Sequence, residues 1–155
     1  MNGIIDIHSS CFPGTVPFVY DPKYSHFLFM RDSSILGCKF MSPEYTIYRL
    51  ESQISTPKYD FDSEDSLMFY IDTQGISKLN PYDNNAKPIS VLNITGGSII
   101  LALDTLNKQV YWANHFDFGI KRATYDGSRM IGFAGISNGA VVGFAFSGLL
   151  FDLSR

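Results

Sequence analysis

The feature that most constrains the fold of this 155-residue chain is an internal repeat with a period of about 42 residues. The best-preserved copy contains four short segments, which are residues 101–104 (LALD), 110–114 (VYWAN), 120–122 (IKR) and 126–128 (DGS). A period of about 40 to 50 residues, built from short segments with alternating apolar side chains, is typical of a propeller blade of four antiparallel strands. The repeat therefore predicts one small sheet per copy.

Weaker copies precede this one. The second copy keeps the same order of segments and comprises residues 59–62, 68–72, 76–78 and 84–85, of which 76–78 lie two residues out of register. The first copy is looser and comprises residues 27–30 and 35–38, and a fourth begins at residues 143–146. A single blade cannot bury both of its faces, so each sheet must pack against a neighbour on either side.

We predict an all-β fold, a partial β-propeller of about three four-stranded antiparallel blades plus a stub. The expected division is an N-terminal lead-in at residues 1–24 and a propeller segment at 25–155, with blades at 25–55, 56–97 and 98–139 and the stub at 140–155. Clusters of Asp, Asn, Gly and Pro supply turns where the repeat requires them, at residues 80–85, 95–97, 125–127 and 137–139.

The composition predicts a packed domain that does not bind nucleic acid. Apolar residues make up 45% of the chain, which is enough for a core. The net charge is −3, and only Lys121 and Arg122 form an adjacent basic pair, so no basic surface for phosphates is indicated.

Cys11 and Cys38 are the only cysteines, which is too few for a disulfide framework. They could form one bridge, but the favoured interpretation is that Cys38 is a buried apolar side chain on the third segment of its copy. No charged start followed by an apolar run is visible at the N-terminus, so the sequence indicates no signal peptide.

The third copy resembles the class B repeat of the low-density lipoprotein receptor family, the Tyr-Trp-Thr-Asp propeller. The similarity is carried by residues 101–104, by Tyr111 and Trp112, and by residues 120–122 and 126–128. Ala113 and Asn114 replace the family's Thr-Asp, and residues 69–72 (FYID) keep only the final carboxylate, Asp72. The family's ring has six blades, which need more residues than this chain has, so we expect a divergent fragment of a longer protein.

The resemblance implies a structural role for the repeat residues. In the family the final Asp of the tetrad accepts hydrogen bonds that tie neighbouring strands together, and we expect the same of Asp72. Asn114 offers a neutral acceptor and a donor instead. The expected structural residues of the repeat are Asp62, Tyr70, Asp72, Asp104, Tyr111, Trp112, Asn114, Ile120, Asp126 and Gly127.

The resemblance also implies a function, namely a non-enzymatic protein-binding module in the ectodomain of a lipoprotein-receptor-like cell-surface protein. The implied partners are a protein ligand and adjacent blades or EGF-like modules. No cofactor, metal or catalytic residue is expected, and membrane contact would come only through a segment outside this chain. Asn93 begins the only N-glycosylation sequon and is a candidate site for a sugar. A matrix or adhesion protein of the nidogen type is an alternative.

An enzyme is the second alternative. A metal-dependent lactonase or esterase on a related propeller would need inward-facing carboxylates around one cation, and Asp62, Asp72 and Asp104 are the candidates by position. The cluster of Asp60, Asp62, Glu64 and Asp65 suggests calcium but lacks the Gly and Glu that an EF-hand loop requires, so a solvated hairpin turn is the favoured interpretation.

Three further patterns have competing interpretations. Residues 135–139 (GISNG) match the nucleophile elbow G-x-S-x-G, but no His follows Ser137, which favours a turn. Residues 130–151 carry no charge and could form a membrane helix, although strands of the third and fourth units are favoured. Phe69, Tyr70, Tyr111 and Trp112 could anchor a ligand, but on alternating strands such side chains are more often core.

Overall fold

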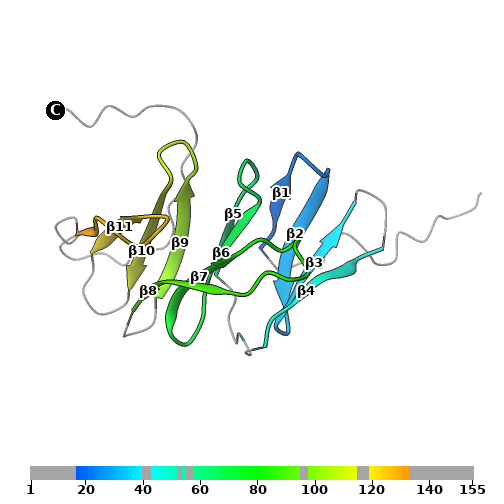
Figure 1. Ribbon diagram of the computed structural model, residues 1–155, viewed down its shortest axis with the longest axis horizontal. Coiled ribbons are helices and arrows are strands. Elements are labelled where there is room, and N and C mark those ends of the chain that lie inside the picture. The colour runs from blue at the N-terminus through cyan, green and yellow to red at the C-terminus, as the bar shows by residue number, and fades with distance from the viewer. Residues whose placement is uncertain are drawn as a thin grey trace, which may run out of the picture.

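The computed structural model describes residues 17–39, 43–51, 54, 58–94, 98–114 and 119–132, and these form three sheets of four antiparallel strands. Within each sheet, strands that are consecutive in the sequence are neighbours, in the orders β1-β2-β3-β4, β5-β6-β7-β8 and β9-β10-β11-β12. No helix occurs in the described part of the chain. Figure 1 shows the three sheets side by side. The predicted all-β fold, a partial propeller, is confirmed.

We name the sheets blade 1, blade 2 and blade 3. Blade 1 contains β1 (Val19–Asp21), β2 (His26–Arg31), β3 (Ser34–Cys38) and β4 (Tyr45–Arg49). Blade 2 contains β5 (Tyr59–Asp62), β6 (Leu67–Ile71), β7 (Gly75–Leu79) and β8 (Ile89–Asn93). Blade 3 contains β9 (Ser98–Asp104), β10 (Gln109–Asn114), β11 (Ile120–Thr124) and β12 (Ile131–Gly132).

The first blade begins earlier than the repeat alignment indicated. β1 pairs with β2 through Val19 opposite Leu28, so the sheet extends into the segment expected to be a lead-in. The reason is that residues 18–21 (FVYD) are the first segment of this copy, and they lie 41 residues before residues 59–62 (YDFD). With them, all three blades start in the same way.

Most of the features predicted for the C-terminal part of the chain lie outside the described residues. Residues 131 and 132 form β12, whereas the stub at 140–155 and the G-x-S-x-G pattern at 135–139 lie beyond the last described residue. Among the residues that the structure describes, no helix has the length and apolar character needed to cross a membrane.

Alternating side chains pack the blades against each other. In β6, Met68 and Tyr70 join a cluster with residues of blade 1, whereas Phe69 joins a cluster with Val110 and Trp112 of blade 3. All five side chains are buried. A strand that is covered on both faces is apolar at successive positions, which explains the run at residues 67–71.

Candidate functional site

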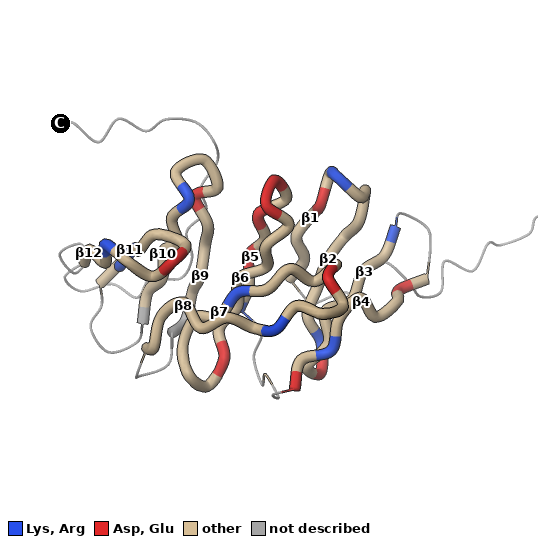
Figure 2. The backbone as a smooth tube through the Cα atoms, viewed as in Figure 1, with Lys and Arg blue, Asp and Glu red and all other residues tan. Residues whose placement is uncertain are grey.

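The first hairpin turn of each blade lies at one end of the molecule. The turns are residues 22–25, 63–66 and 105–108, and they stand at the upper edge of Figure 1. Because strands alternate in direction, the β3–β4, β7–β8 and β11–β12 connections end at the same side. We call this side the hairpin face. Figure 2 shows acidic residues concentrated at its β5–β6 turn.

Each turn starts from an aspartate at the end of the first strand. The Oδ1 atom of Asp21 accepts a hydrogen bond from the Lys23 amide at 3.0 Å, and Oδ1 of Asp104 accepts one from the Asn107 amide at 3.0 Å. In blade 2, Oδ1 of Asp62 accepts from the amides of residues 64 and 65 at 3.0 and 3.2 Å. These bonds satisfy backbone donors that the turn takes out of the strand ladder.

The left-handed residue of each turn also repeats. Ser25, Ser66 and Lys108 have φ values of 55°, 55° and 53°. Positive φ is uncommon for residues other than glycine, so its recurrence at the same turn position indicates that one backbone conformation is built three times. The hairpin face is therefore a set of matching turns.

Two of the aspartates also bind the following blade. Oδ2 of Asp21 accepts a hydrogen bond from the Tyr82 hydroxyl at 2.6 Å, and Oδ2 of Asp62 accepts one from the Tyr125 hydroxyl at 3.0 Å. Both carboxylates are fully buried. We call each pair an Asp–Tyr latch. Burial and the neighbouring carboxylate raise the pKa of both tyrosines, so the hydroxyls stay protonated and can donate.

Lys108 completes the second latch. Its Nζ lies 2.9 Å from Asp62 Oδ2, 2.9 Å from Asp65 Oδ2 and 3.1 Å from Glu64 Oε2. Burial alone would raise the pKa of Asp62, but hydrogen bonds from Lys108, the turn and Tyr125 outweigh it and lower that pKa. The ammonium group thus stands where a calcium ion would have to bind, and the acidic cluster is an ion-pair network between blades 2 and 3. Within the described ranges, no group of three or more His, Cys, Asp or Glu side chains is arranged to hold a metal ion.

The fourth carboxylate of that cluster, Asp60, binds a backbone amide. Asp60 Oδ2 accepts a hydrogen bond from the Leu103 amide of β9 at 2.9 Å. Burial raises the pKa of Asp60, and the bonds from Leu103 and Phe61 oppose this shift. Asp60 therefore connects the first strands of two blades.

An aromatic patch lies beside the first latch, and it comprises Tyr24, His26, Tyr45 and Tyr82. The rings of Tyr24 and Tyr82 are 4.4 Å apart between centroids, and the Tyr45 hydroxyl is 2.8 Å from Nε2 of His26. Tyr24 and Tyr45 are 43% and 44% exposed, whereas His26 is buried. Burial, aided by Lys39, lowers the pKa of His26 against the opposing effect of Asp21, which favours the neutral ring. The patch is a fixed apolar surface with polar rims.

The residues expected from the repeat are in part structural and in part core. Asp72 accepts hydrogen bonds from the amides of Gln74 and Gly75 at 2.7 and 3.0 Å and from the Ser77 hydroxyl at 2.6 Å, so it ties β6 to β7. Tyr70 and Trp112 are each 1% exposed, which excludes them as ligand anchors in this fold.

The other expected positions lie in blade 3. Tyr111 is buried, and its hydroxyl donates to Gln109 Oε1 at 3.1 Å. Ile120 pairs with Ala113 at the start of β11. Asn114 is the last residue of β10, and its side chain lies outside what the structure describes.

The turn at Asp126 and Gly127 faces blade 2. Asp126 Oδ1 accepts from the Ser128 amide at 2.9 Å. Gly127 has φ +81°, and a Cβ there would lie 2.1 Å from the carbonyl oxygen of Val91 in β8. Only glycine allows this approach.

The three carboxylates proposed as metal ligands do not converge. Asp62 and Asp104 end their strands at the hairpin face, whereas Asp72 follows β6 at the opposite end of blade 2. The Asp62 carboxylate already accepts hydrogen bonds from Tyr125 and Lys108, and the Asp104 carboxylate accepts one from Asn107 in its own turn.

Several of the residues that build the site did not stand out in the sequence. Tyr82 and Tyr125 immediately precede the turn sequences Asp83-Asn84 and Asp126-Gly127, and Asp21 ends a segment 41 residues before Asp62. The signal for Asp21 is its position, one repeat period before Asp62 and at the end of an equivalent segment. The tyrosines carry no local signal that they reach another blade.

Cys38 is buried and is part of a disulfide bond. Cys11, the only other cysteine of the chain, lies outside the described residues. The expectation that Cys38 is buried is therefore confirmed, whereas the expectation that it is not part of a bridge is wrong.

Comparisons with known proteins support the fold alone. No protein-family model matches the chain, and no curated protein matches it. A solved nidogen/laminin complex matches 69% of this chain at 17% identity with a TM-score of 0.57, and the match covers 43% of that chain. A putative TolB from Agrobacterium tumefaciens matches 76% at 14% identity with a TM-score of 0.55 and 49% coverage. The chain thus spans about half the length of these propeller neighbours.

Proposed function

We propose that this chain is a non-enzymatic protein-binding module and that the hairpin face, centred on the aromatic patch, is its binding surface. The observation that carries the proposal is the exposure of Tyr24 and Tyr45 on a framework held by buried latches. Tyrosine is enriched among the residues that dominate binding energy at protein interfaces. The patch combines an apolar ring surface with hydroxyl groups at its rim, which suits a protein partner.

Rigidity supports this assignment. Tyr82 is held by its bond to Asp21 and by contact with Tyr24, and Tyr45 is held by His26. Side chains that are fixed before binding lose little conformational entropy when a partner arrives, so more of the contact energy appears as affinity. Loops held on stacked strands commonly carry binding function in this way.

We further propose an extracellular setting. The disulfide at Cys38 supports it, because disulfides persist in oxidising compartments. Asn93 is exposed at the end of β8, where a sugar would be solvated. The nidogen neighbour was solved in complex with laminin, which is consistent with a matrix or receptor protein of the class B repeat type. EGF-like neighbours and a membrane anchor elsewhere in a longer protein belong to the same proposal.

The test is a binding panel with matched variants. The purified chain is immobilised and probed by biolayer interferometry with purified laminin and other purified extracellular matrix proteins. We expect at least one to bind, and Tyr24→Ser and Tyr45→Ser each to weaken that binding by about tenfold or more, as for interface hot spots. Ile131→Ser is the control, because Ile131 is also exposed but lies on the outer strand β12. Equal loss in all three variants, or no binding to any probe, would refute the assignment.

A further inference from the structure

The aromatic patch is built across the seam between two blades. The rings of Tyr24, His26 and Tyr45 belong to blade 1, whereas Tyr82 belongs to the β7–β8 connection of blade 2. The Tyr82 ring reaches the others, because its centroid lies 4.4 Å from that of Tyr24 and 6.2 Å from that of His26. The surface proposed to bind a partner therefore keeps its shape only while blades 1 and 2 stay in this relative position.

Asp21 is the residue of blade 1 that holds Tyr82. Its Oδ2 atom accepts the hydrogen bond from the Tyr82 hydroxyl at 2.6 Å, and its Oδ1 atom accepts one from the Lys23 amide at 3.0 Å, in the turn that carries Tyr24. One carboxylate thus fixes both the ring from blade 2 and the turn that presents the neighbouring ring of blade 1. Asp21 is 0% exposed, so any effect it has on binding must pass through these neighbours.

The second latch makes the same bond but holds a buried ring. The Tyr125 hydroxyl donates to Asp62 at 3.0 Å, and the Tyr125 ring lies 4.4 Å from that of Phe69, which is itself 0% exposed. By contrast, the ring beside Tyr82 is that of Tyr24, which is 43% exposed. The two latches therefore differ in whether the ring that they support lies where a partner could reach it.

We propose that Asp21 is the positioning residue of the aromatic patch and acts on the exposed Tyr24 ring through Tyr82. This inference rests on the proposed binding function, because it concerns the same surface. Without the latch, the ring at position 82 and the Tyr24 ring beside it gain freedom that a partner must remove when it binds. Fixing one such side chain costs about twofold to tenfold in affinity, so releasing both should weaken binding about fivefold or more.

Tyr82→Phe tests the positioning role in the biolayer interferometry assay with purified laminin and the other matrix proteins. The variant keeps the ring and removes only the hydroxyl, which is already bound to a buried carboxylate. We expect about fivefold weaker binding to any matrix protein that the wild-type chain binds. Tyr125→Phe is the matched control, because it makes the same change at the second latch and should keep the affinity within about twofold. Both are measured at a temperature at which circular dichroism shows them folded.

Two substitutions of Asp21 separate the latch from the carboxylate charge. In Asp21→Asn, the carboxamide oxygen can accept from the Lys23 amide while its NH₂ group donates to the Tyr82 hydroxyl oxygen. This variant should therefore retain binding within about twofold of wild type. Asp21→Ala removes both bonds and should bind at least as weakly as Tyr82→Phe.

A second readout needs no partner. In NMR spectra of the full chain with isotope-labelled tyrosine, the ring current of Tyr82 shifts the ring signals of Tyr24, since the centroids are 4.4 Å apart. Phenylalanine has a ring current too, so a ring that is still held would preserve this shift. We expect the Tyr24 signals to move towards those of a solvent-exposed tyrosine in Tyr82→Phe and in Asp21→Ala, and to stay unchanged in Tyr125→Phe.

The outcomes distinguish the positioning role from the binding function. If Tyr24→Ser leaves binding unchanged, or no probe binds, the proposed function is refuted together with the effect of Asp21 on affinity. If Tyr24→Ser weakens binding but Tyr82→Phe does not, or if Tyr125→Phe weakens it as much as Tyr82→Phe, the positioning role is wrong and the proposed function stands. Unchanged Tyr24 signals in Tyr82→Phe would also overturn the positioning role.

Discussion

Replacing Tyr125 by phenylalanine tests whether the Asp–Tyr latch holds the blades together. The substitution removes only the hydroxyl that donates to the buried Asp62 carboxylate at 3.0 Å. Tyr125 is 7% exposed, the centroid of its ring lies 4.4 Å from that of Phe69, and phenylalanine keeps that contact. The change therefore isolates one hydrogen bond between blades 2 and 3.

The expected loss follows from the remaining partners of Asp62. A hydrogen bond to a charged group contributes about 1.5–3 kcal/mol. Since Lys108 still neutralises Asp62 at 2.9 Å, we expect the lower half of that range, about 1.5–2 kcal/mol in the free energy of unfolding. For a domain of this size, this corresponds to a melting temperature about 3–8 °C lower.

Urea unfolding and calorimetry at one fixed protein concentration measure the effect. Tyr24→Phe is the matched control, because Tyr24 is exposed and its hydroxyl is not part of a latch, so its change should stay within about 0.5 kcal/mol. A double-mutant cycle with Asp62→Asn should give a coupling energy of about 1 kcal/mol or more. A coupling near zero, or equal losses in Tyr125→Phe and Tyr24→Phe, would refute the latch as a source of stability.

Three other predictions address the same framework. The folded pKa of Asp62 is lowered, so the stabilisation that its carboxylate provides is present above the unfolded pKa and is lost as pH falls through the folded pKa. In urea titrations, the difference in unfolding free energy between wild type and Asp62→Asn should therefore shrink between pH 5 and pH 2, and a constant difference would contradict the charge pairing. Gly127→Ala should cost about 1–3 kcal/mol by the same assay, since the added Cβ would lie 2.1 Å from the Val91 carbonyl at positive φ, whereas Gly132→Ala, where nothing lies within 4 Å, should change little. Millimolar Ca²⁺ or Zn²⁺ should leave the melting temperature unchanged, because Lys108 already neutralises the acidic cluster; a rise with metal concentration would favour the enzyme alternative.

The strands were largely readable from the sequence, and the exceptions have a physical cause. β5, β6, β9 and β10 each carry alternating or continuous apolar residues between turn residues, which is a local signal. β1 is only three residues long, and residues 18–21 (FVYD) share with residues 59–62 (YDFD) only two aromatic positions and the closing aspartate. A strand that short is held by pairing and by its latch, and its own composition is a weak predictor.

Within the site, the carboxylate cluster also separates what local sequence indicates from what only the packing of two blades sets. From the sequence, Asp60, Asp62, Glu64 and Asp65 could be described only as a hairpin turn or a poor calcium loop. In the structure Asp62, Glu64 and Asp65 pair with one ammonium group that is 46 residues from Asp62, and Asp60 binds a backbone amide 43 residues away. Neither partner belongs to the same sheet, so no pattern within one repeat could reveal it.

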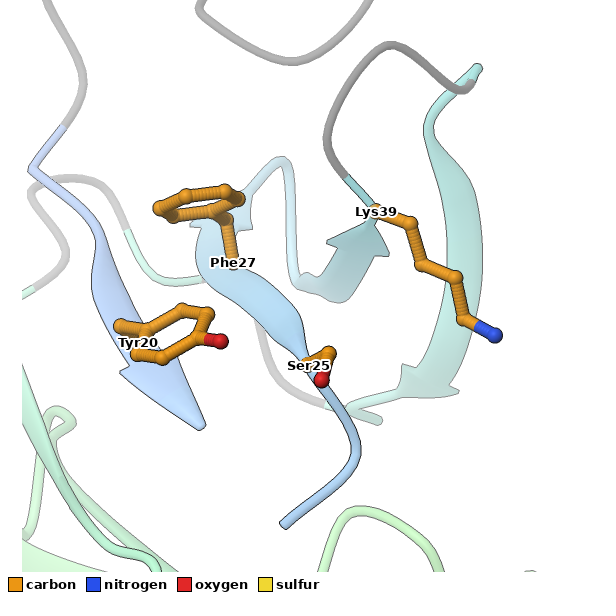
Figure 3. Close-up of a pocket in the computed structure, with 4 residues that line it drawn as sticks. All are labelled: Tyr20, Ser25, Phe27 and Lys39. Atoms are coloured by element: carbon orange, nitrogen blue, oxygen red, sulfur yellow. The ribbon is translucent and has the colours of Figure 1, made fainter. Parts of the chain in front are cut away.

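The amino-acid sequence alone determined the period of about 42 residues, the turn positions and the alternation of side chains, because each depends on residues close together in one blade. Only the tertiary structure decided which tyrosine reaches which aspartate, at separations of 61 and 63 residues. It also decided that Lys108 fills the acidic cluster and that Tyr20, Ser25, Phe27 and Lys39 line a cavity on blade 1 (Figure 3). These features arise where two sheets meet, and the packing of one blade on the next sets them.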